Sequence, residues 1–366
     1  MLALPCARFA RCDAIFICRP LVHCVGRRRA TPMILTVGLL LASAAIIYLS
    51  CEYFVNGVEW AGQRFGVSRG AVGTVLAAFG TALPESVVTF VAVVFGDNDA
   101  QKEIGVGAAL GGPLVLATVA YAVVGFVFLT SKDRQTGKLL ATVNTKKLSR
   151  DQSWFITIFI FKVLLGLVGF ALKPWLGILF LLAYGIYIRS ELHSEDALGR
   201  HEKLDPLKFQ PNTKDPSSGW VLFQTVGALA VIFAGSRLFV HQLDAIGPWL
   251  GMRPQMVALL LSPVATELPE ILNAVIWVRQ GKVALALGNI SGAMMIQATV
   301  PSALGLLFTP WMLEPPLIWA ASVTLAAVIG LDILLRRNAL GSTRLSLFSL
   351  FYVLFGAGLF VLGRHP

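Results

Sequence analysis

Charged residues are scarce in this sequence of 366 residues: only 14% are Asp, Glu, Lys or Arg, whereas soluble globular proteins contain about 25%. Hydrophobic residues make up 56%, and the mean hydropathy is +0.73. This balance excludes an ordinary soluble enzyme. The 34 Gly and 18 Pro are typical of helices packed in lipid. The composition therefore predicts an all-α polytopic membrane protein whose surroundings include the lipid bilayer.

Cysteine and histidine are also few, with five residues of each type. Cys6, Cys12, Cys18 and Cys24 lie near the start, and only Cys51 lies in the apolar part, so no disulfide framework or zinc spacing is visible. No Ser/His/Asp or paired-His pattern and no phosphate-binding GxxxxGK[ST] segment is present. We therefore expect no enzyme, no ATP-driven pump and no cofactor.

Half of the formal net charge of +10 comes from residues 1–32, which contain six Arg and one acidic residue, Asp13. The remaining positive charges are scattered between hydrophobic stretches, whereas nucleic-acid binding needs a basic face. We therefore expect no nucleic-acid partner, and no protein partner is evident. We interpret the leader as a mis-assigned start with Met33 as the initiator; a targeting segment is the alternative, since such leaders are Arg-rich and acid-poor.

Long hydrophobic stretches dominate the rest of the chain. A membrane-spanning helix needs about 20 mostly apolar residues. On this criterion the sequence predicts ten spans, at residues 33–57, 69–95, 104–129, 154–171, 174–188, 220–246, 255–278, 283–308, 317–335 and 345–362.

The loops between these spans differ in positive charge. If residue 33 starts outside, the inside loops contain 18 Lys and Arg and the outside segments contain four. Cytoplasmic loops collect positive charge, so this asymmetry predicts termini outside, in a plasma (inner) membrane. The charged, Pro-containing stretch 189–219 is then a solvated cytoplasmic linker between residues 33–188 and 220–362.

The two halves resemble each other. A shift of 185 residues aligns Phe54 with Phe239 and Pro84-Glu85 with Pro269-Glu270, and a run of further matches follows. Five predicted spans separate equivalent points, so the second copy enters the membrane upside down. The sequence thus predicts two inverted five-helix repeats, an architecture that places transported substrates near the bilayer midplane.

Glu85 and Glu270 lie inside predicted spans at matched positions. A bare acid at the centre of a membrane helix costs about 2.5–3.5 kcal/mol, so each needs a partner or a function. Each follows a Pro, which removes one backbone hydrogen bond and frees the carbonyl oxygen four residues earlier, at Gly80 and Ala265. Carboxylate and carbonyl oxygens suit hard cations such as Ca²⁺ or Na⁺. A protonated carboxyl that only packs or donates a hydrogen bond is the structural alternative.

Further oxygens near these glutamates are candidate ligands. Thr81 and Thr266 precede the glutamates by four residues, although helical Thr hydroxyls often bond to their own backbone. Glu267 lies one turn before Glu270 and is a candidate ligand, proton acceptor or gate residue. Asn289 and Gln297 in the eighth span are further candidates, with interhelical hydrogen bonding as the alternative.

At these motifs the sequence resembles the sodium/calcium exchanger membrane family. GTALPESVVTFVAVVFG at 80–96 is similar to the family's GTSLPE repeat, and ATELPEILNAVIWVRQGKVALALGNISGA at 265–293 is similar to its ATSLPE and LALGN repeat. The resemblance extends from about 33 to 362. It implies ten helices in two inverted repeats, with ion sites on helices 2, 3, 7 and 8 and with Glu85 and Glu270 as the central ligands.

The sequence departs from the family pattern at several ligand positions. The Ser before LPE is replaced by Ala82 and by Glu267. In the third span GAALGGP has no polar side chain where the family has Asn and Ser, and Gln297 replaces an acid in the eighth. We expect such a site to bind fewer ions, or to bind them differently.

These features predict a secondary active antiporter that moves inorganic cations, exchanging Ca²⁺ for Na⁺ by alternating access. Two shared glutamates bind either one divalent or two monovalent ions, and this competition couples the fluxes. Exchange of the cation for H⁺ is one alternative, because a carboxyl in a low-dielectric site titrates near neutral pH. A non-transporting membrane scaffold with a degenerate ion site is the other.

Overall fold

The computed structural model describes residues 33–64, 77–130, 143–192, 205–213 and 215–362. The predicted leader, residues 1–32, lies outside these ranges, so both interpretations of it stay predictions. Within the described ranges the regular structure is helical, without a strand.

The helices of the first half are α1 (Met33–Arg64), α3 (Ala77–Phe95), α4 (Asp99–Val115), the π-helical turn η2 (Leu116–Ala120), α5 (Tyr121–Thr130), α7 (Thr145–Leu165), the 3-10 turn η3 (Lys173–Leu176) and α8 (Gly177–Leu192). Those of the second half are α9 (Ser218–Leu250), α10 (Pro254–Thr266), α11 (Leu268–Arg279), α12 (Val283–Phe308), α13 (Pro315–Arg336), α14 (Ser342–Ser346) and α15 (Ser349–Leu362).

Seven helical runs in the described part are long and apolar enough to cross a membrane: α1, α4–η2–α5, α9, α10–α11, α12, α13 and α14–α15. The shorter apolar helix α3, together with α7 and α8, corresponds to the other predicted spans. The predicted all-helical membrane fold with about ten spans is thereby confirmed.

The fourth helix differs most from its predicted bounds of 154–171. It begins earlier because Asn144 caps it, accepting a hydrogen bond from the Lys147 backbone N–H at 3.1 Å. It ends at Leu165, and the chain reaches η3 through exposed residues. A hydropathy window places the start too late, because the first turns of the helix are charged. It places the end too late, because the exposed connection after Leu165 is apolar.

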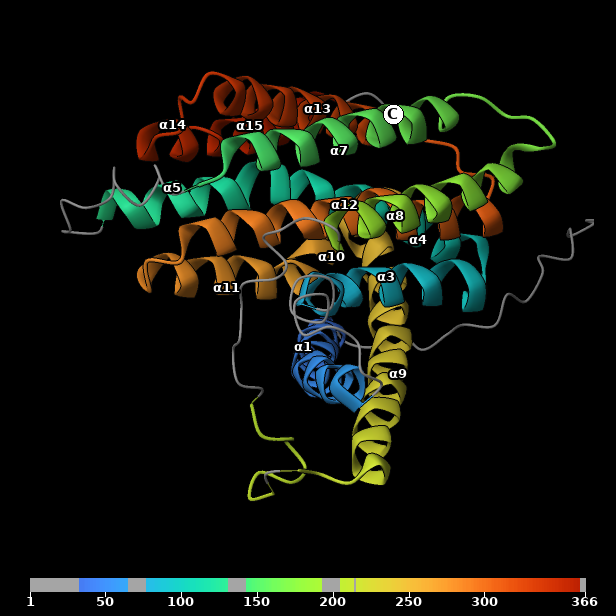
Figure 1. Ribbon diagram of the computed structural model, residues 1–366. Coiled ribbons are helices and arrows are strands. Elements are labelled where there is room, and N and C mark those ends of the chain that lie inside the picture. Colours follow the sequence, from blue (N-terminus) through green and yellow to red (C-terminus); the bar gives the residue numbers. More distant parts are fainter. Residues whose placement is uncertain (1–32, 65–76, 131–142, 193–204, 214, 363–366) are drawn as a thin grey trace, which may run out of the picture. The chain divides into compact units, whose positions relative to one another are not determined.

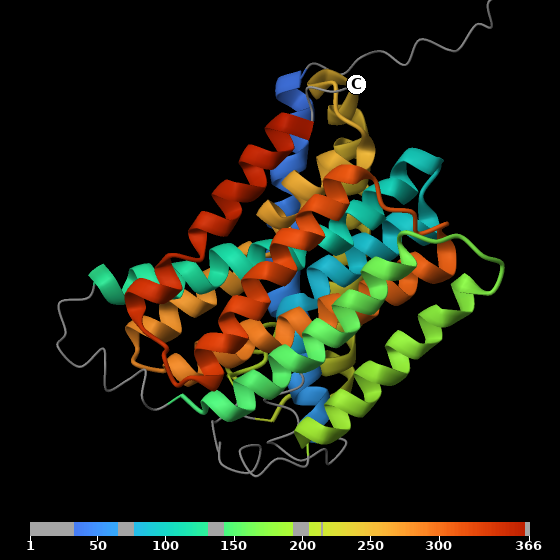
Figure 2. The same ribbon diagram turned by 90° about the horizontal axis from the view of Figure 1, so that it is seen from above.

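The first helices of the two halves, α1 and α9, pack against each other (Figure 1). Their buried residues form a cluster with α3, which includes Ile47, Phe54 and Phe239. A larger cluster joins α4, α7, α12 and α13. Figure 2 shows the run α4–η2–α5, in teal, as one long helix through this second group. Apolar burial thus places both LPE segments inside the protein.

Two glycines set the approach of α4 to α10. A Cβ atom added at Gly107 would lie 2.2 Å from the Gln255 carbonyl oxygen, and one at Gly111 would lie 2.8 Å from the Leu259 carbonyl oxygen. Small residues spaced four apart let helix backbones approach closely in membranes. The glycines of the third span therefore bring the backbone of the first half against the helix that leads to Glu267.

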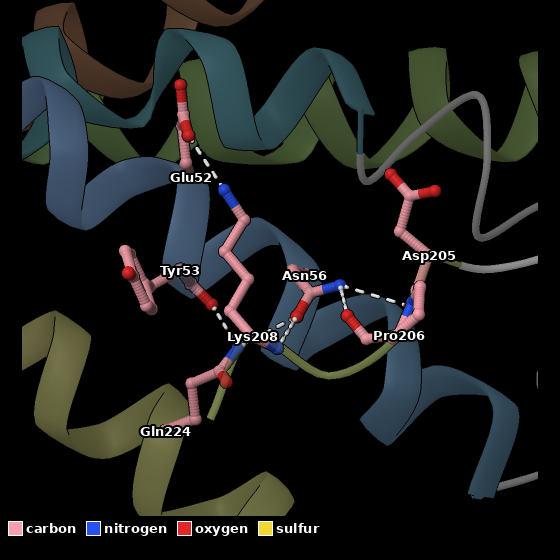
Figure 3. Close-up of polar contacts among 7 residues, drawn as sticks. All are labelled: Glu52, Tyr53, Asn56, Asp205, Pro206, Lys208 and Gln224. Atoms are coloured by element: carbon pink, nitrogen blue, oxygen red, sulfur yellow. Dashed lines mark hydrogen bonds and ion pairs between the residues drawn. The ribbon is translucent and has the colours of Figure 1, made fainter. Parts of the chain in front are cut away.

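The described end of the predicted linker, residues 205–213, is bound to α1 and α9 (Figure 3). The Asn56 side chain donates to the carbonyl oxygens of Asp205 (3.4 Å) and Pro206 (3.3 Å) and accepts from the Lys208 backbone N–H (3.0 Å). Gln224 of α9 donates to Asn56 at 2.9 Å. This segment is thus held by a polar network that includes the first helix of each half.

Apolar and charged contacts complete this attachment. Leu207 is fully buried beside Trp60, whose indole N–H donates to the Asp205 carbonyl oxygen at 2.9 Å. The Lys208 ammonium lies 2.7 Å from a carboxylate oxygen of Glu52. Pattern reasoning predicts only a solvated linker here, whereas these residues pack on the protein.

Candidate ion-binding site

The second LPE motif breaks its helix. α10 ends at Thr266, Glu267 lies between the helices, and α11 begins at Leu268 with Pro269 in its first turn. Pro269 has no N–H to donate to the Ala265 carbonyl, so this helical hydrogen bond is missing across the break. In the first half, by contrast, α3 continues through Pro84. The matched motifs therefore differ in backbone structure.

Three acidic side chains near these motifs are fully buried: Glu85 in α3, Glu267 at the break and Glu270 in α11. Glu85 and Glu267 interact electrostatically across the two halves. Glu270 lies in the first turn of α11 and interacts with Cys51 in α1. The structure thus adds a third fully buried carboxyl group, Glu267, to the two that the repeat predicts.

Glu267 accepts hydrogen bonds from two of the predicted site residues. The Gln297 side-chain N–H of α12 donates to Oε2 at 2.7 Å, and the Thr266 hydroxyl lies 2.9 Å from Oε1. Thr266 also lies 3.2 Å from the Ser262 carbonyl oxygen, the backbone bond expected of a helical Thr. Thr266, Glu267 and Gln297 therefore form one polar cluster.

Glu85 has few direct partners. Its carboxylate oxygens are buried and accept no hydrogen bond of ordinary geometry within the described residues. The hydroxyls of Thr266 and Thr89 are close enough to interact with it. Thr89 was not among the predicted residues, although its position one helical turn after Glu85 is the signal that identifies it. Oxygen atoms around Glu85 thus come from both halves.

Gly112 explains why the third span has no polar side chain at this point. A Cβ atom added there would lie 2.8 Å from Oε1 of Gln297 and 2.9 Å from Oε1 of Glu267. The longer side chains of the second half fill the space next to the α4 backbone. The missing polar residue in α4 and the extra carboxyl at Glu267 are therefore two parts of one rearrangement.

A buried lysine, which the sequence analysis did not single out, lies at the same site. Lys162 of α7 is fully buried, and its ammonium donates to the Ala109 carbonyl oxygen of α4 at 3.0 Å. It also interacts electrostatically with Glu85. The available signal is that Lys162 and Arg237 are the only basic residues well inside the predicted spans.

The other predicted site residues are less closely connected. Gly80 and Thr81 belong to α3, but the burial of Gly80 and the side chain of Thr81 are outside the described part. Ala265 is half-buried in α10. Asn289 of α12 is 7% exposed, and its Nδ2 has no hydrogen-bond partner among the described residues. Asn289 is separated by about two turns of α12 from Gln297 of the Glu267 cluster.

The chemistry of this cluster is that of a hard-cation site. Within the described ranges, no group of three or more His, Cys, Asp or Glu side chains is arranged to hold a metal ion. Carboxylate oxygens of Glu85 and Glu267 instead lie with hydroxyl, amide and backbone oxygens, a set that Ca²⁺ and Na⁺ accept.

Comparison with known proteins finds a matching family model and similar membrane proteins. The family model described as sodium/calcium exchanger protein matches residues 35–190 and 220–363. The inner membrane protein YrbG of Escherichia coli K12 is 25% identical over 298 residues, which cover 77% of this chain and 83% of YrbG.

Two solved structures share the fold. The sodium-calcium exchanger NCX_Mj is 22% identical, with a TM-score of 0.56 over 89% of this chain and 99% of NCX_Mj. The H⁺/Ca²⁺ exchanger CAX is 16% identical, with a TM-score of 0.57 over 90% of this chain and 88% of CAX. The predicted fold class is confirmed by these likenesses.

Proposed function

This chain belongs to the sodium/calcium exchanger family, and on that premise we propose that it is a secondary antiporter that exchanges Ca²⁺ for Na⁺ by alternating access. The observation that supports this function is the pair Glu85 and Glu267, two fully buried carboxyl groups from opposite halves that interact through space and share Thr266 as a neighbour. Burying such groups is costly, and a bound cation offsets that cost.

The ligands of the proposed site are Glu85 and Glu270, with the hydroxyl, amide and backbone oxygens around them. Thr266, Glu267 and Gln297 form the described cluster; Gly80, Thr81, Ala265 and Asn289 remain proposed members on the strength of the sequence pattern. Carboxylates shared between one divalent and several monovalent ions exclude simultaneous loading with both. This competition couples the two fluxes, because the protein carries either Ca²⁺ or the monovalent ions across the membrane in any one step, and never both.

Exchange of Ca²⁺ for H⁺ is the second candidate, and Glu267 is the observation that favours it. It supplies a third buried carboxyl where the family pattern has Ser. The fold is as similar to the H⁺/Ca²⁺ exchanger CAX as to NCX_Mj. A carboxyl group in a low-dielectric site is a suitable proton carrier.

We place the protein in the plasma (inner) membrane, with its termini outside and residues 189–219 in the cytoplasm. The excess of Lys and Arg in alternate loops supports this orientation. The similarity to YrbG, an inner membrane protein, supports the location.

The experiment is Ca²⁺ flux in vesicles that contain the purified protein, first with an imposed Na⁺ gradient and then with an imposed pH gradient. Glu85→Gln should abolish flux, whereas Asp99→Asn, which changes a carboxyl with a 98% exposed side chain, should not. Flux driven by Na⁺ supports the first candidate, and flux driven only by pH supports the second. Absence of flux under both gradients in the unmodified protein would contradict both and favour the non-transporting scaffold.

A further inference from the structure

Four charged side chains in the described part of the chain are fully buried, and all four lie at the proposed ion site. Three are the carboxyl groups of Glu85, Glu267 and Glu270, and the fourth is the ammonium group of Lys162. If all four are charged, the protein contributes two net negative charges, the number that one divalent cation neutralises. The lysine therefore changes the charge that the substrate ions have to supply.

The partner of Lys162 is a carbonyl oxygen that the helix itself leaves free. In a regular α-helix the N–H of residue 113 would donate to the carbonyl of residue 109. Pro113 has no N–H, so the Ala109 carbonyl lacks this bond. The Lys162 ammonium donates to that oxygen at 3.0 Å. At the LPE motifs, a carbonyl freed by proline is the kind of ligand expected to bind a cation. At Ala109 the cationic group that it binds is the ammonium group of Lys162, a side chain of α7.

The position of Lys162 is fixed by packing around α7. Its ammonium lies 4.6 Å from the ring centroid of Phe159, a cation–π distance. The Trp311 indole N–H donates to the Lys162 carbonyl oxygen at 3.0 Å. The ammonium also interacts electrostatically with Glu85. This geometry fixes the ammonium group within electrostatic reach of Glu85 without exposing it to solvent.

We infer that the Lys162 ammonium is a tethered cation that permanently occupies the α4 side of the ion site in place of one substrate cation. The inference rests on the proposed antiport. It assigns Lys162 a role in stoichiometry: two negative charges remain for the substrates, so one Ca²⁺ exchanges for two monovalent ions. Exchange at this ratio moves no net charge across the membrane.

The test measures the coupling ratio and its dependence on voltage in proteoliposomes of the full-length protein. The driving ion is Na⁺, or H⁺ if only the pH gradient supports flux, and the membrane potential is set with K⁺ and valinomycin. At a ratio of two, a tenfold gradient of the driving ion balances a Ca²⁺ gradient of about 100-fold, and at three about 1000-fold. One net charge per cycle would shift that balance about 50-fold per 100 mV.

The unmodified protein should show a ratio of two and no effect of voltage. Lys162→Met should raise the ratio to three and make flux voltage-dependent, because the third carboxyl then needs another mobile cation. Lys162→Arg keeps the charge and should keep the ratio of two. Lys173→Met is the matched control, since Lys173 is a second buried lysine that donates to backbone carbonyl oxygens, of Val168 and Trp311, away from the glutamates.

Two results would overturn the inference while leaving antiport intact: a ratio of three in the unmodified protein, or a Lys162→Met variant that transports at a ratio of two. If Lys162→Met does not fold, the voltage dependence of the unmodified protein decides. Absence of gradient-driven flux in the unmodified protein would instead remove the proposed function, and this inference with it.

Discussion

Gly107 and Gly288 are related by the internal repeat, yet the structure predicts opposite effects for the same substitution. Gly107 of α4 faces α10, and an added Cβ would lie 2.2 Å from the Gln255 carbonyl oxygen and 2.9 Å from its carbon. Gly288 of α12 has no atom within 4 Å of an added Cβ. Both residues lie inside helices. The two substitutions therefore have the same effect on helix propensity and differ only in how the added methyl group packs.

The magnitude for Gly107→Ala follows from the rigidity of its neighbour. The obstructing atoms are backbone, so α4 and α10 have to separate by about 1 Å, and overpacking of this kind costs about 1–3 kcal/mol. Gly288→Ala meets no obstruction and removes a helix-interior glycine, which stabilises by about 0.5–1 kcal/mol. We therefore expect the two variants to differ by about 1.5–4 kcal/mol in the free energy of unfolding.

The assay is unfolding of the purified protein in detergent, followed by tryptophan fluorescence, with Ca²⁺ flux measured in parallel. Gly107→Ala should lower the midpoint of unfolding and reduce flux, because α4 also forms one wall of the ion site at Gly112. Gly288→Ala should leave the midpoint unchanged or raise it. Equal midpoints for the two variants would refute the close approach of α4 to α10.

Three further predictions concern the site and the bound linker segment. Thr266→Val keeps the shape of the side chain but removes a hydrogen bond to a carboxylate, worth about 1.5–3 kcal/mol, so Ca²⁺ half-saturation in flux assays should rise about tenfold or more. Gln297→Leu removes the N–H that donates to Glu267 at 2.7 Å. Thermal unfolding should show that the free energy of unfolding falls by about 1.5–3 kcal/mol, and the fall for Thr266→Val should be no larger. Asn56→Leu should release residues 205–213, which limited proteolysis would detect as faster cleavage in this segment; Asn212→Ala, at an exposed position, is the control, and equal cleavage rates would contradict the attachment.

The helical architecture was predictable because it depends on local composition. The sequence alone shows the long apolar stretches, the charged loops and the repeat of Pro84-Glu85 at Pro269-Glu270. Thr266, Glu267 and Gln297 could be singled out for a related reason, because they are polar residues inside apolar stretches.

Lys162 was not predicted because its significance is entirely tertiary. A single lysine does not interrupt an apolar window, and its partner Ala109 is 53 residues away in sequence. Nor does a hydropathy scan register that Pro113 leaves that particular carbonyl free. The bound linker was missed for the same reason, since Asn56 and Pro206 are 150 residues apart. Interactions of this kind become visible only when helices are placed side by side.

Comparison of the two repeats also indicates that their divergence is more than a loss of polar ligand residues. α4 has no polar side chain beside the carboxyl groups, and Gly112 leaves room there that Glu267 and Gln297 occupy. The extra acid in the second half is accompanied by a buried base in the first, Lys162. A degenerate site would be expected to lose buried charges, because each is costly in lipid. This site instead has both repeat-related glutamates, an extra acid at Glu267 and a buried base at Lys162, which is the pattern expected of a site that still binds ions with an altered stoichiometry.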